Sequence, residues 1–503
     1  MDEPVCVTRQ GAVRGETTPG GVAVFRGIPY AAPPFGPHRF MAPQPVPAWD
    51  GVRDATAFGP TAPKAPYAPP FDVLLQETSV PGEDCLNLNV WTPDPTGRAP
   101  VMVWLHGGAF SNGAGSLPGY DGAAFARDGV LCVTVNYRLG ADGYLSLPDA
   151  PDNRGMLDQI AALEWVRDNI AAFGGDPERV TVFGESAGAM SIGLLLTAPG
   201  AHGLFRRAIL QSGAAHHCVR QQTARRITAR FADLLGVEPT AAAVARVPLD
   251  RLLAAQTQLR AEVIGHPDPA LWGEVASDTM PFEPVAARGE TLPGPDLPVE
   301  LLIGTNAEEY RLYTVPAGVM DHIDERRLRA ATVRYGLDPD TALPVYRAGR
   351  PDATPGDLMC AVIGDWVFRI PAIRLAEAVP GARMYEFGWR SPAYDGQLGA
   401  CHAAEIAFVF DNLGAAGESR LIGTQPPQAL ADAMHAAWVA FAATGDPGWA
   451  PYDSRDRTTM LFGANAGADV GARAGGEGAA DPAKPRAVHD PRAAERELWA
   501  GLR

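Results

Sequence analysis

Short apolar runs along the chain predict strands that alternate with helices. The runs with the length and composition of buried strands lie at residues 86–91, 101–105, 130–136, 180–183 and 205–211. Between the later runs, residues 157–173 and 187–196 carry apolar side chains at helical spacing. Strand, helix and strand in this order predict a parallel sheet flanked by helices.

The flanking regions predict smaller elements. Residues 1–30 alternate short apolar runs with glycine and proline, which indicates small antiparallel strands. Twelve prolines between residues 29 and 70 favour an extended surface segment without regular structure. Two further core strands are expected at residues 299–304 and 382–387.

Three later stretches complete the expected organisation. Segments rich in Ala, Leu and Arg, at about 221–260 and 320–380, predict helices inserted between the strands. Residues 463–487 are mostly glycine and alanine without periodicity, and we expect a mobile loop there. After this loop, the apolar positions of residues 491–502 indicate a terminal helix.

Composition and charge narrow the classes of function. The 503 residues include 55 glycines and 47 prolines, an excess that indicates many shaped loops, and loops often carry function. A formal net charge of −16 and the lack of a basic run argue against nucleic-acid binding. No apolar stretch approaches the ~18 residues of a membrane span, and the acidic start lacks a secretory signal, so a cytoplasmic protein is expected.

The first chemical motif is Gly-Glu-Ser-Ala-Gly at residues 184–188. A serine between a strand and a helix, with a glycine two residues away on each side, is typical of a nucleophile turn, where close neighbouring backbone leaves no room for side chains. The alternative is a serine in an ordinary glycine-rich turn. The predicted strand before the motif and the predicted helix after it favour the nucleophile, Ser186.

The second motif is His-Gly-Gly-Ala-Phe at residues 106–110, directly after an apolar run. Ester hydrolysis places negative charge on a carbonyl oxygen, and oriented backbone N–H groups stabilise that charge. A glycine run after a strand leaves such N–H groups open to a substrate, and the N–H of the residue after the nucleophile, Ala187, adds to them in this architecture. A plain glycine-rich turn is the alternative.

Together these motifs resemble those of the type-B carboxylesterases, the cholinesterase-like family of α/β-hydrolases, in its bacterial para-nitrobenzyl-esterase-like branch. Residues 173–188 are similar to the family's serine signature and residues 83–91 to its second signature. Shorter landmarks of the family are matched at residues 136–140, 153–159 and 211–213. The resemblance extends from about residue 11 to residue 499.

The resemblance implies the α/β-hydrolase fold. This fold has a large, mostly parallel central sheet flanked by helices, here with a small N-terminal antiparallel sheet and helical insertions over the active site. We therefore expect a single domain of residues 1–503. Its catalytic core would comprise residues 85–215, 299–310 and 382–410, and its insertions residues 221–298 and 315–380.

The same resemblance supplies the other two members of a catalytic triad. A predicted strand ends with two adjacent carboxylates, Glu308 and Glu309, which the residues alone do not separate. The family's acid lies five residues after a glycine, which selects Glu309 and leaves Glu308 as a solvated surface carboxylate. The family usually has a glycine next, where this chain has Tyr310. Residues 399–406 are similar to the family's histidine loop, which makes His402 the general base.

The implied mechanism is that of a serine carboxylesterase. His402 takes the proton of Ser186, whose oxygen attacks the ester carbonyl to form an acyl-enzyme, and Glu309 orients His402. Water then releases the acyl group. The implied partner is a small-molecule ester, no cofactor is required, and a monomer or weak dimer is expected. The oxyanion is bound by the backbone N–H groups of Gly108, Ala109 and Ala187.

Other histidines and cysteines carry no expected site. His216, His217 and Cys218 could suggest a metal, but no third ligand is spaced to match, so no metal is expected and both histidines are taken as surface residues. His106 is expected to support the oxyanion loop rather than carry a proton, and Cys401 to be packed rather than nucleophilic.

The cysteines also bear on the compartment. The six cysteines are scattered, without spacing for a zinc site. Secreted members of the family usually tie the cysteine at the position of Cys85 to one upstream, and residues 60–84 contain none. This departure favours a reducing compartment.

The bond that is cleaved stays open at this level. The same residues would cleave a carbamate, an amide or a thioester, because the insertions expected to line the acyl and alcohol pockets carry no recognisable specificity signal. The alternative from another class is a non-catalytic binding protein on the cholinesterase-like fold. Such proteins typically lose the serine or the histidine, whereas this chain has a residue of the required type at all three triad positions.

Overall fold

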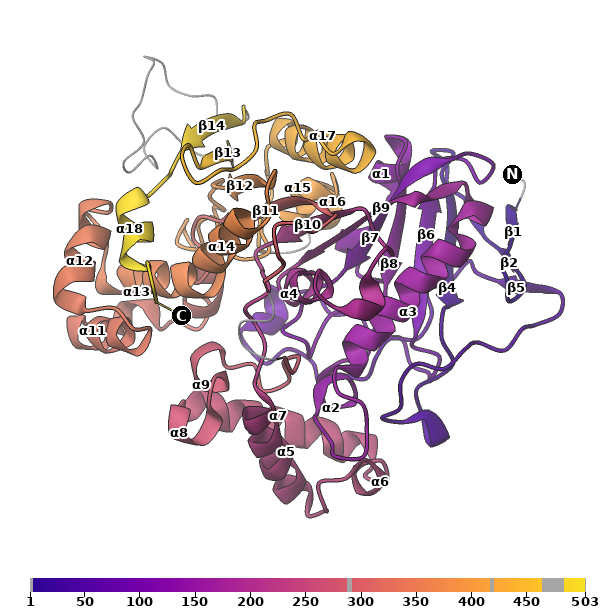
Figure 1. The fold of residues 1–503 in the computed structure, drawn as a ribbon, viewed down its shortest axis with the longest axis horizontal. Helices are drawn as coiled ribbons and strands as arrows, with labels where there is room; N and C mark the ends of the chain where they lie inside the picture. Colours follow the sequence, from indigo (N-terminus) through magenta and orange to yellow (C-terminus); the bar gives the residue numbers. More distant parts are fainter. Residues whose placement is uncertain (1–2, 287–291, 417–419, 464–483, 503) are drawn as a thin grey trace. The chain divides into compact units, whose positions relative to one another are not determined.

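The computed structural model describes residues 3–286, 292–416, 420–463 and 484–502 (Figure 1). The chain forms two compact units. The first comprises residues 1–67, 77–209 and 215–293, and the second comprises residues 68–76, 210–214 and 294–503. The single domain expected from the sequence stays a prediction. Most of the predicted mobile loop at 463–487 lies outside the described residues.

A mixed sheet forms the core of the first unit, with strand order β9-β7-β8-β6-β4-β3. Strand β7 pairs in parallel with β8 and with β9, whereas β6, β4 and β3 add antiparallel pairs. The central strands are almost wholly buried, which is why they read as continuous apolar runs, and the predicted strands are confirmed. The strands are β3 (Glu16–Thr17), β4 (Ala23–Pro29), β6 (Asn87–Thr92), β7 (Ala99–Leu105), β8 (Leu131–Val135) and β9 (Gly175–Glu185).

Helices flank this sheet (Figure 1). Helix α4 (Ala187–Leu195) contacts β7 and β9, and α1 (Ala123–Arg127) contacts β6 and β8. Helix α3 (Arg154–Asn169) also contacts β9 and continues into a 3-10 turn, which confirms the helix predicted at residues 157–173. The periodic burial of α3 and the full burial of α4 explain why both helices were recognisable in the sequence.

A small second sheet lies near the N-terminus, with strand order β1-β2-β5. Strands β1 (Val5–Val7) and β2 (Ala12–Arg14) pair antiparallel, as expected. Strand β5 (Val52–Asp54), however, pairs in parallel with β2, inside the proline-rich stretch that was expected to have no regular structure. That expectation is wrong for β5 because its three residues are all exposed, so backbone pairing forms the strand without an apolar pattern.

Helices between residues 221 and 278 complete the first unit. Helix α5 (Gln221–Leu235) packs on α7 (Leu249–Gly265) and α8 (Pro269–Trp272), and α7 contacts α9 (Val275–Asp278). The helices predicted at about 221–260 are therefore confirmed, whereas the insertion of residues 221–298 as a whole stays a prediction. Strand β10 (Arg207–Gln211) precedes these helices and carries the chain from the first unit into the second.

The second unit has its own strands, in the order β14-β13-β12-β11. Two of these pairs, β11 with β12 and β12 with β13, are parallel, and β14 is antiparallel to β13. Strands β11 and β12 confirm the predictions. Strand β14 begins inside the loop predicted at 463–487 and was not predicted, because its four residues are too few for their alternate burial to give a recognisable sequence pattern. The strands are β11 (Glu300–Asn306), β12 (Arg383–Phe387), β13 (Thr458–Phe462) and β14 (Arg486–His489).

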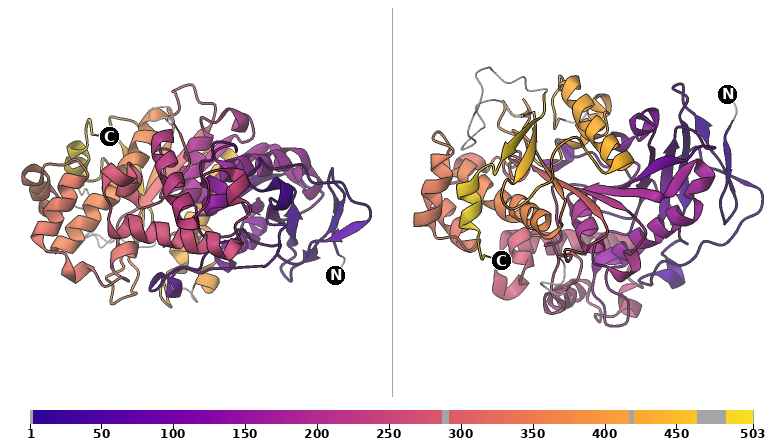
Figure 2. Two further views of the ribbon diagram at one scale, coloured as in Figure 1. Left: turned by 90° about the horizontal axis from the view of Figure 1, so that it is seen from below. Right: turned by 45° about the horizontal axis from the view of Figure 1, so that its top comes forward.

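A cluster of helices follows β11, coloured in salmon and orange tones in both views of Figure 2. Helix α13 contacts α11 and α12, and it continues through the π-helix Asp365–Arg369 into α14. The terminal helix α18 (Ala493–Leu498) contacts α12, which confirms the helix expected at residues 491–502. The cluster comprises α11 (Glu325–Arg334), α12 (Pro339–Ala348), α13 (Pro355–Gly364) and α14 (Ile370–Ala378).

One long helix was not predicted. Helix α17 (Gln428–Thr444) packs on α15 (Ile406–Val409), with Leu430, Met434 and Trp438 on its buried face. These residues recur every four positions, a helical signal that the sequence did carry. Among the described helices, none is long and apolar enough to span a membrane.

Candidate active site

Ser186 lies at the sharp turn between β9 and α4 in the first unit. Its backbone has φ 54° and ψ −125°, a conformation that a non-glycine residue holds only under constraint from its surroundings. The flanking glycines explain the constraint. A Cβ on Gly188 would lie 1.9 Å from the backbone oxygen of Leu105, and one on Gly184 would lie 2.6 Å from the same oxygen. The predicted nucleophile therefore occupies a strained strand–turn–helix.

The glycine-rich loop after β7 lies against this turn. A Cβ on Gly107 would come within 3.0 Å of Ser186 Cβ, and one on Gly108 would lie 2.2 Å from the backbone oxygen of Asn112. Ala109 and Phe110, although not glycines, have φ of 52° and 57°. The backbone N–H of Asn112 donates to Gly108 O at 2.8 Å and closes the loop. The loop that carries Gly108 and Ala109 is thus fixed beside Ser186 and Ala187.

His106, the first residue of this loop, is held in place by Tyr137. Its ring stacks on Tyr137 with centroids 4.4 Å apart, and the Tyr137 hydroxyl donates to His106 O at 2.5 Å. Burial lowers the pKa of His106 to about 3, so the ring is neutral at ordinary pH. A neutral, stacked imidazole suits the supporting role expected of His106.

Glu309 and His402 form a buried pair in the second unit. His402 Nδ1 donates to Glu309 Oε2 at 2.7 Å, and the backbone N–H of His402 donates to Glu309 O at 3.2 Å. Both residues are 3% exposed. The rings of Phe368 and Tyr313 lie against the imidazole, with centroids 4.7 and 5.7 Å from it. Packing and hydrogen bonds therefore hold the ring in one orientation.

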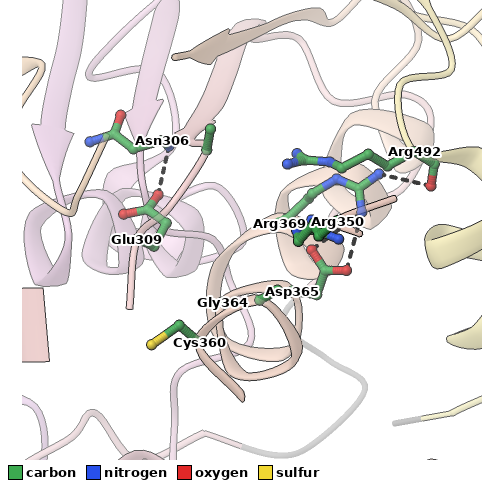
Figure 3. A pocket seen from close by; sticks show the side chains of 10 residues that line it. Asn306, Glu309, Arg350, Cys360, Gly364, Asp365, Arg369 and Arg492 are labelled. Carbon is green, nitrogen blue, oxygen red and sulfur yellow. Dashed lines mark hydrogen bonds and ion pairs between the residues drawn. The ribbon is translucent and has the colours of Figure 1, made fainter. Parts of the chain in front are cut away.

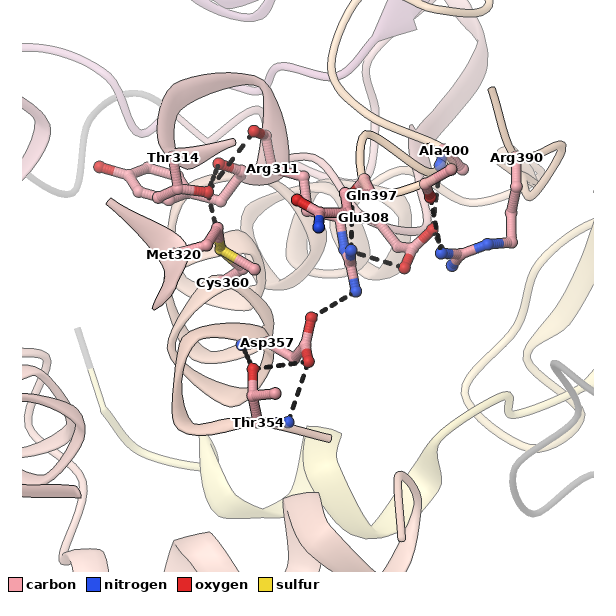
Figure 4. A network of polar contacts seen from close by, with 12 residues as sticks. Glu308, Arg311, Thr314, Met320, Thr354, Asp357, Cys360, Arg390, Gln397 and Ala400 are labelled. Atoms are coloured by element: carbon pink, nitrogen blue, oxygen red, sulfur yellow. Dashed lines mark hydrogen bonds and ion pairs between the residues drawn. The ribbon is translucent and has the colours of Figure 1, made fainter. Parts of the chain in front are cut away.

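The neighbouring carboxylate, Glu308, points elsewhere (Figure 4). It accepts a hydrogen bond from the backbone N–H of Ala400 at 3.0 Å and forms ion pairs with Arg311, at 3.0 Å, and with Arg390. A Cβ on Gly399 would lie 2.1 Å from Glu308 Oε2. Glu308, expected to be a solvated surface carboxylate, is half-buried, and its contacts hold the loop that carries His402. The two adjacent carboxylates thus have separate partners.

Tyr310 is accommodated without strain where the family usually has glycine. Its φ of −75° and ψ of −8° are ordinary right-handed helical values, since Tyr310 directly precedes the short helix α10 (Arg311–Thr314). Its ring packs on Tyr313, with centroids 5.2 Å apart. The departure from the family pattern therefore leaves the backbone after Glu309 regular.

A second set of polar groups contacts Glu309, and no role was predicted for them from the sequence. The backbone N–H of Asn306 donates to Glu309 Oε1 at 2.8 Å, and Asn306 Nδ2 donates to Glu405 Oε2 at 2.6 Å. Gln211 Nε2 donates to Glu405 Oε1 at 3.1 Å, and Trp438 Nε1 to Gln211 Oε1 at 3.0 Å. Asn306 at the end of a buried strand and Glu405 three residues after His402 were visible signals for this network.

Burial, and next the charge of Glu309, raise the pKa of Glu405. A carboxyl that holds its proton more strongly adds less negative charge beside Glu309, which itself accepts from His402 and Asn306. Asn306 therefore links the carboxyl groups of Glu309 and Glu405.

Glu309 also lines a small cavity of about 20 Å³, enough for about one water molecule (Figure 3). The π-helix supplies Asp365 and Arg369 to it, and these two form an ion pair at 3.2 Å. Burial alone would raise the pKa of Asp365, but the nearby charges of Arg369 and Arg492 outweigh it and lower the pKa. The cavity is thus lined by paired charges.

The fold also overturns the expectation for His217. This residue is fully buried rather than on the surface, and the fold brings Asp278 and Glu283 to it, although neither is near it in sequence. Sequence spacing had supplied no further ligand for a metal at this position.

Comparison with known proteins gives one consistent result. A family model described as "Carboxylesterase family" matches residues 2–471. A para-nitrobenzyl esterase of Bacillus subtilis is 40% identical, over 92% of this chain and 95% of its own length. A phenmedipham hydrolase of Pseudarthrobacter oxydans is 36% identical, over 93% of this chain and 97% of its own length.

Solved structures are similar over nearly the whole chain. The crystal structure of a carboxylesterase of Geobacillus stearothermophilus has a TM-score of 0.79 and 35% identity, and the match covers 98% of this chain and 99% of the other. A para-nitrobenzyl esterase structure has a TM-score of 0.76 and 34% identity, with 99% of both chains covered.

Proposed function

Because this chain belongs to the carboxylesterase family of α/β-hydrolases, and is therefore a carboxylic ester hydrolase, we propose that Ser186, His402 and Glu309 are its catalytic triad. In this assignment Ser186 is the nucleophile, His402 the general base and Glu309 the acid that orients the imidazole. The oxyanion is assigned to the backbone N–H groups of Gly108, Ala109 and Ala187.

The observation that carries the assignment is the buried contact of 2.7 Å between His402 Nδ1 and Glu309 Oε2. A proton held at Nδ1 by the carboxylate leaves Nε2 as the basic nitrogen, which can accept the proton of a serine hydroxyl. The carboxylate also stabilises the imidazolium that forms when the proton arrives. The stacked rings of Phe368 and Tyr313 support one ring orientation, as a general base requires.

The reaction then proceeds in two halves. Ser186 Oγ, losing its proton to His402 Nε2, bonds to the ester carbonyl carbon, and the negative charge moves to the carbonyl oxygen. When the carbonyl reforms, the bond to the alcohol oxygen breaks and His402 returns the proton to the alcohol. Water repeats the sequence on the acyl-enzyme, releasing the acid and free Ser186.

Replacement of Ser186 by alanine tests the assignment. We expect kcat on a para-nitrophenyl ester to fall by on the order of 10⁴- to 10⁶-fold, because the covalent route is lost, while near-UV circular dichroism and Tm stay close to those of the wild type. Retention of a tenth of the wild-type turnover would exclude Ser186 as the nucleophile.

The bond and the substrate size need a graded panel. Esters with acyl and alcohol groups of increasing size, together with a carbamate, an amide and a thioester, separate the alternatives that share the acyl-enzyme mechanism. The relatives named para-nitrobenzyl esterase and phenmedipham hydrolase make para-nitrobenzyl esters and phenmedipham the first compounds to include. A wild-type protein that turns over no member of the panel would instead favour the binding-protein alternative.

We also propose a cytoplasmic location. All six cysteines are described and buried, and none of them forms a disulfide, which is in keeping with a reducing compartment. Fractionation of a producing cell tests this proposal, with the enzyme expected in the fraction that holds the cytoplasmic markers.

A further inference from the structure

A compact group of metal-ligating side chains lies in the first unit, outside the residues assigned to ester hydrolysis. His217, Asp278 and Glu283 each offer one ligand atom, and these three atoms lie within 4.8 Å of one another. His217 is 0% and Glu283 1% exposed, whereas Asp278 is half-buried. Two ligands are therefore shielded from water, and the third lies nearer the surface.

Backbone contacts bring the ligand-bearing segments together. Val219, two residues after His217, forms an isolated parallel bridge with Val285, two residues after Glu283. The backbone N–H of Val219 donates to Pro284 O at 2.9 Å. The Asn153 side chain fixes the same segment, since it donates to Val285 O at 2.8 Å and accepts from the backbone N–H of Val285 at 2.7 Å.

Asp278 is also held in place. It ends helix α9, and its Oδ1 accepts from the backbone N–H of Met280 at 3.2 Å. Thr279, in the left-handed conformation with φ 60°, turns the chain directly after it. The three side chains thus come from stretches of backbone that hydrogen bonds hold in place.

The separation of the His217 and Glu283 ligand atoms is compatible with both of them binding one metal ion. His217 Nδ1 and Glu283 Oε1 are 3.8 Å apart, beyond the 2.7–3.2 Å range of an N–H···O hydrogen bond. Nitrogen and oxygen ligands bound to one ion at about 2.0–2.2 Å lie roughly 3 to 4 Å from each other.

We propose that His217, Asp278 and Glu283 bind one divalent transition-metal ion, and that Zn²⁺ suits the donor set best. One imidazole nitrogen with two carboxylate oxygens is a borderline set that Zn²⁺ accepts, whereas Ca²⁺ and Mg²⁺ prefer oxygen ligands alone. The ion ties the segment after β10 to the segment after α9. Its role is to stabilise the first unit, and ester turnover does not require it.

Isothermal titration of the full-length protein, freed of metal by a chelator, tests the site. ZnCl₂ should bind with one-to-one stoichiometry and raise Tm by at least about 2 °C at saturating concentration, whereas CaCl₂ should produce neither effect. Ester turnover should be the same in the metal-free and the zinc-loaded protein, which separates this test from that of the proposed triad. Absence of stoichiometric zinc binding would overturn the proposal.

Matched variants identify the ligands. Glu283→Gln keeps the shape of the buried side chain, and Asp278→Asn changes a half-buried residue whose loss the fold tolerates more easily. Each should weaken zinc binding at least tenfold, and His216→Gln, next to the site in sequence, should leave the Kd unchanged. Undiminished binding in Asp278→Asn, or a loss of binding only in His216→Gln, would show that another set of residues holds the ion.

Discussion

Replacing each of the two adjacent glutamates by glutamine, in separate variants, tests which of them is the acid of the triad. Glu309→Gln removes the charge that faces His402 across 2.7 Å, in a place where both residues are only 3% exposed. Glu308→Gln removes a charge whose partners are Arg311 and Arg390, while the amide oxygen can still accept from the backbone N–H of Ala400.

The structure sets different magnitudes for the two variants. For charge centres about 4 Å apart in a protein environment with an effective dielectric constant near 20, the attraction is about 4 kcal/mol. Loss of this stabilisation when His402 becomes charged corresponds to roughly 10³-fold in rate, and the amide can also favour the wrong tautomer of the ring, so we expect kcat to fall by about 10³- to 10⁴-fold.

For Glu308→Gln we expect less than a tenfold loss of activity. The side chain is 20% exposed and that of Arg390 44% exposed, so solvent screens the ion pair and its loss costs about 1 kcal/mol of stability. The measurable effect should therefore be a lower Tm rather than a lower kcat.

Steady-state hydrolysis of a para-nitrophenyl ester, with urea denaturation of the same samples, measures both effects. Glu309→Asp serves as the control, because a carboxylate is retained one methylene further from His402, and it should keep more activity than Glu309→Gln. Equal losses of activity in Glu308→Gln and Glu309→Gln, or a larger loss in Glu308→Gln, would refute the assignment of Glu309.

Three other expectations follow from the geometry. Gly188→Ala places a Cβ 1.9 Å from Leu105 O and should abolish soluble, active enzyme. In the control Gly119→Ala the new Cβ has nothing within 4 Å, so its urea denaturation should match that of the wild type. An active Gly188→Ala enzyme would contradict the tight turn. Burial lowers the pKa of His106 from 6.5 to about 3, so between these values the unfolded chain binds a proton that the folded chain does not. The free energy of unfolding should therefore fall as the pH decreases through this window, and His106→Asn should reduce the slope. All six cysteines are buried, and burial raises the pKa of Cys6 to about 12, so a thiol reagent should label none of the six until the protein is denatured. Rapid labelling of the native protein would show that a cysteine is accessible.

The sequence predicted those elements whose signals are local and strong. Strands such as β7 and β8 are buried on both faces and therefore appear as continuous apolar runs. The nucleophile turn was recognisable because its two glycines lie within two residues of Ser186. In the structure, a Cβ on either glycine would clash with the backbone oxygen of Leu105. Strand β5 escaped notice because backbone pairing alone forms it, with all three of its residues exposed.

The sequence by itself determined the family motifs, the strand–turn–helix around Ser186 and the residue types of a Ser-His-Glu triad. The residues alone did not separate the two adjacent carboxylates, and the family resemblance selected Glu309. The tertiary structure shows its contact with His402, 93 positions away. It also decided that His217 lies beside Asp278 and Glu283, where sequence spacing offered no further ligand. The physical reason is the same in both cases. A turn is formed by contacts between neighbours in the chain, whereas a side chain's distant partners depend on how whole strands and helices pack.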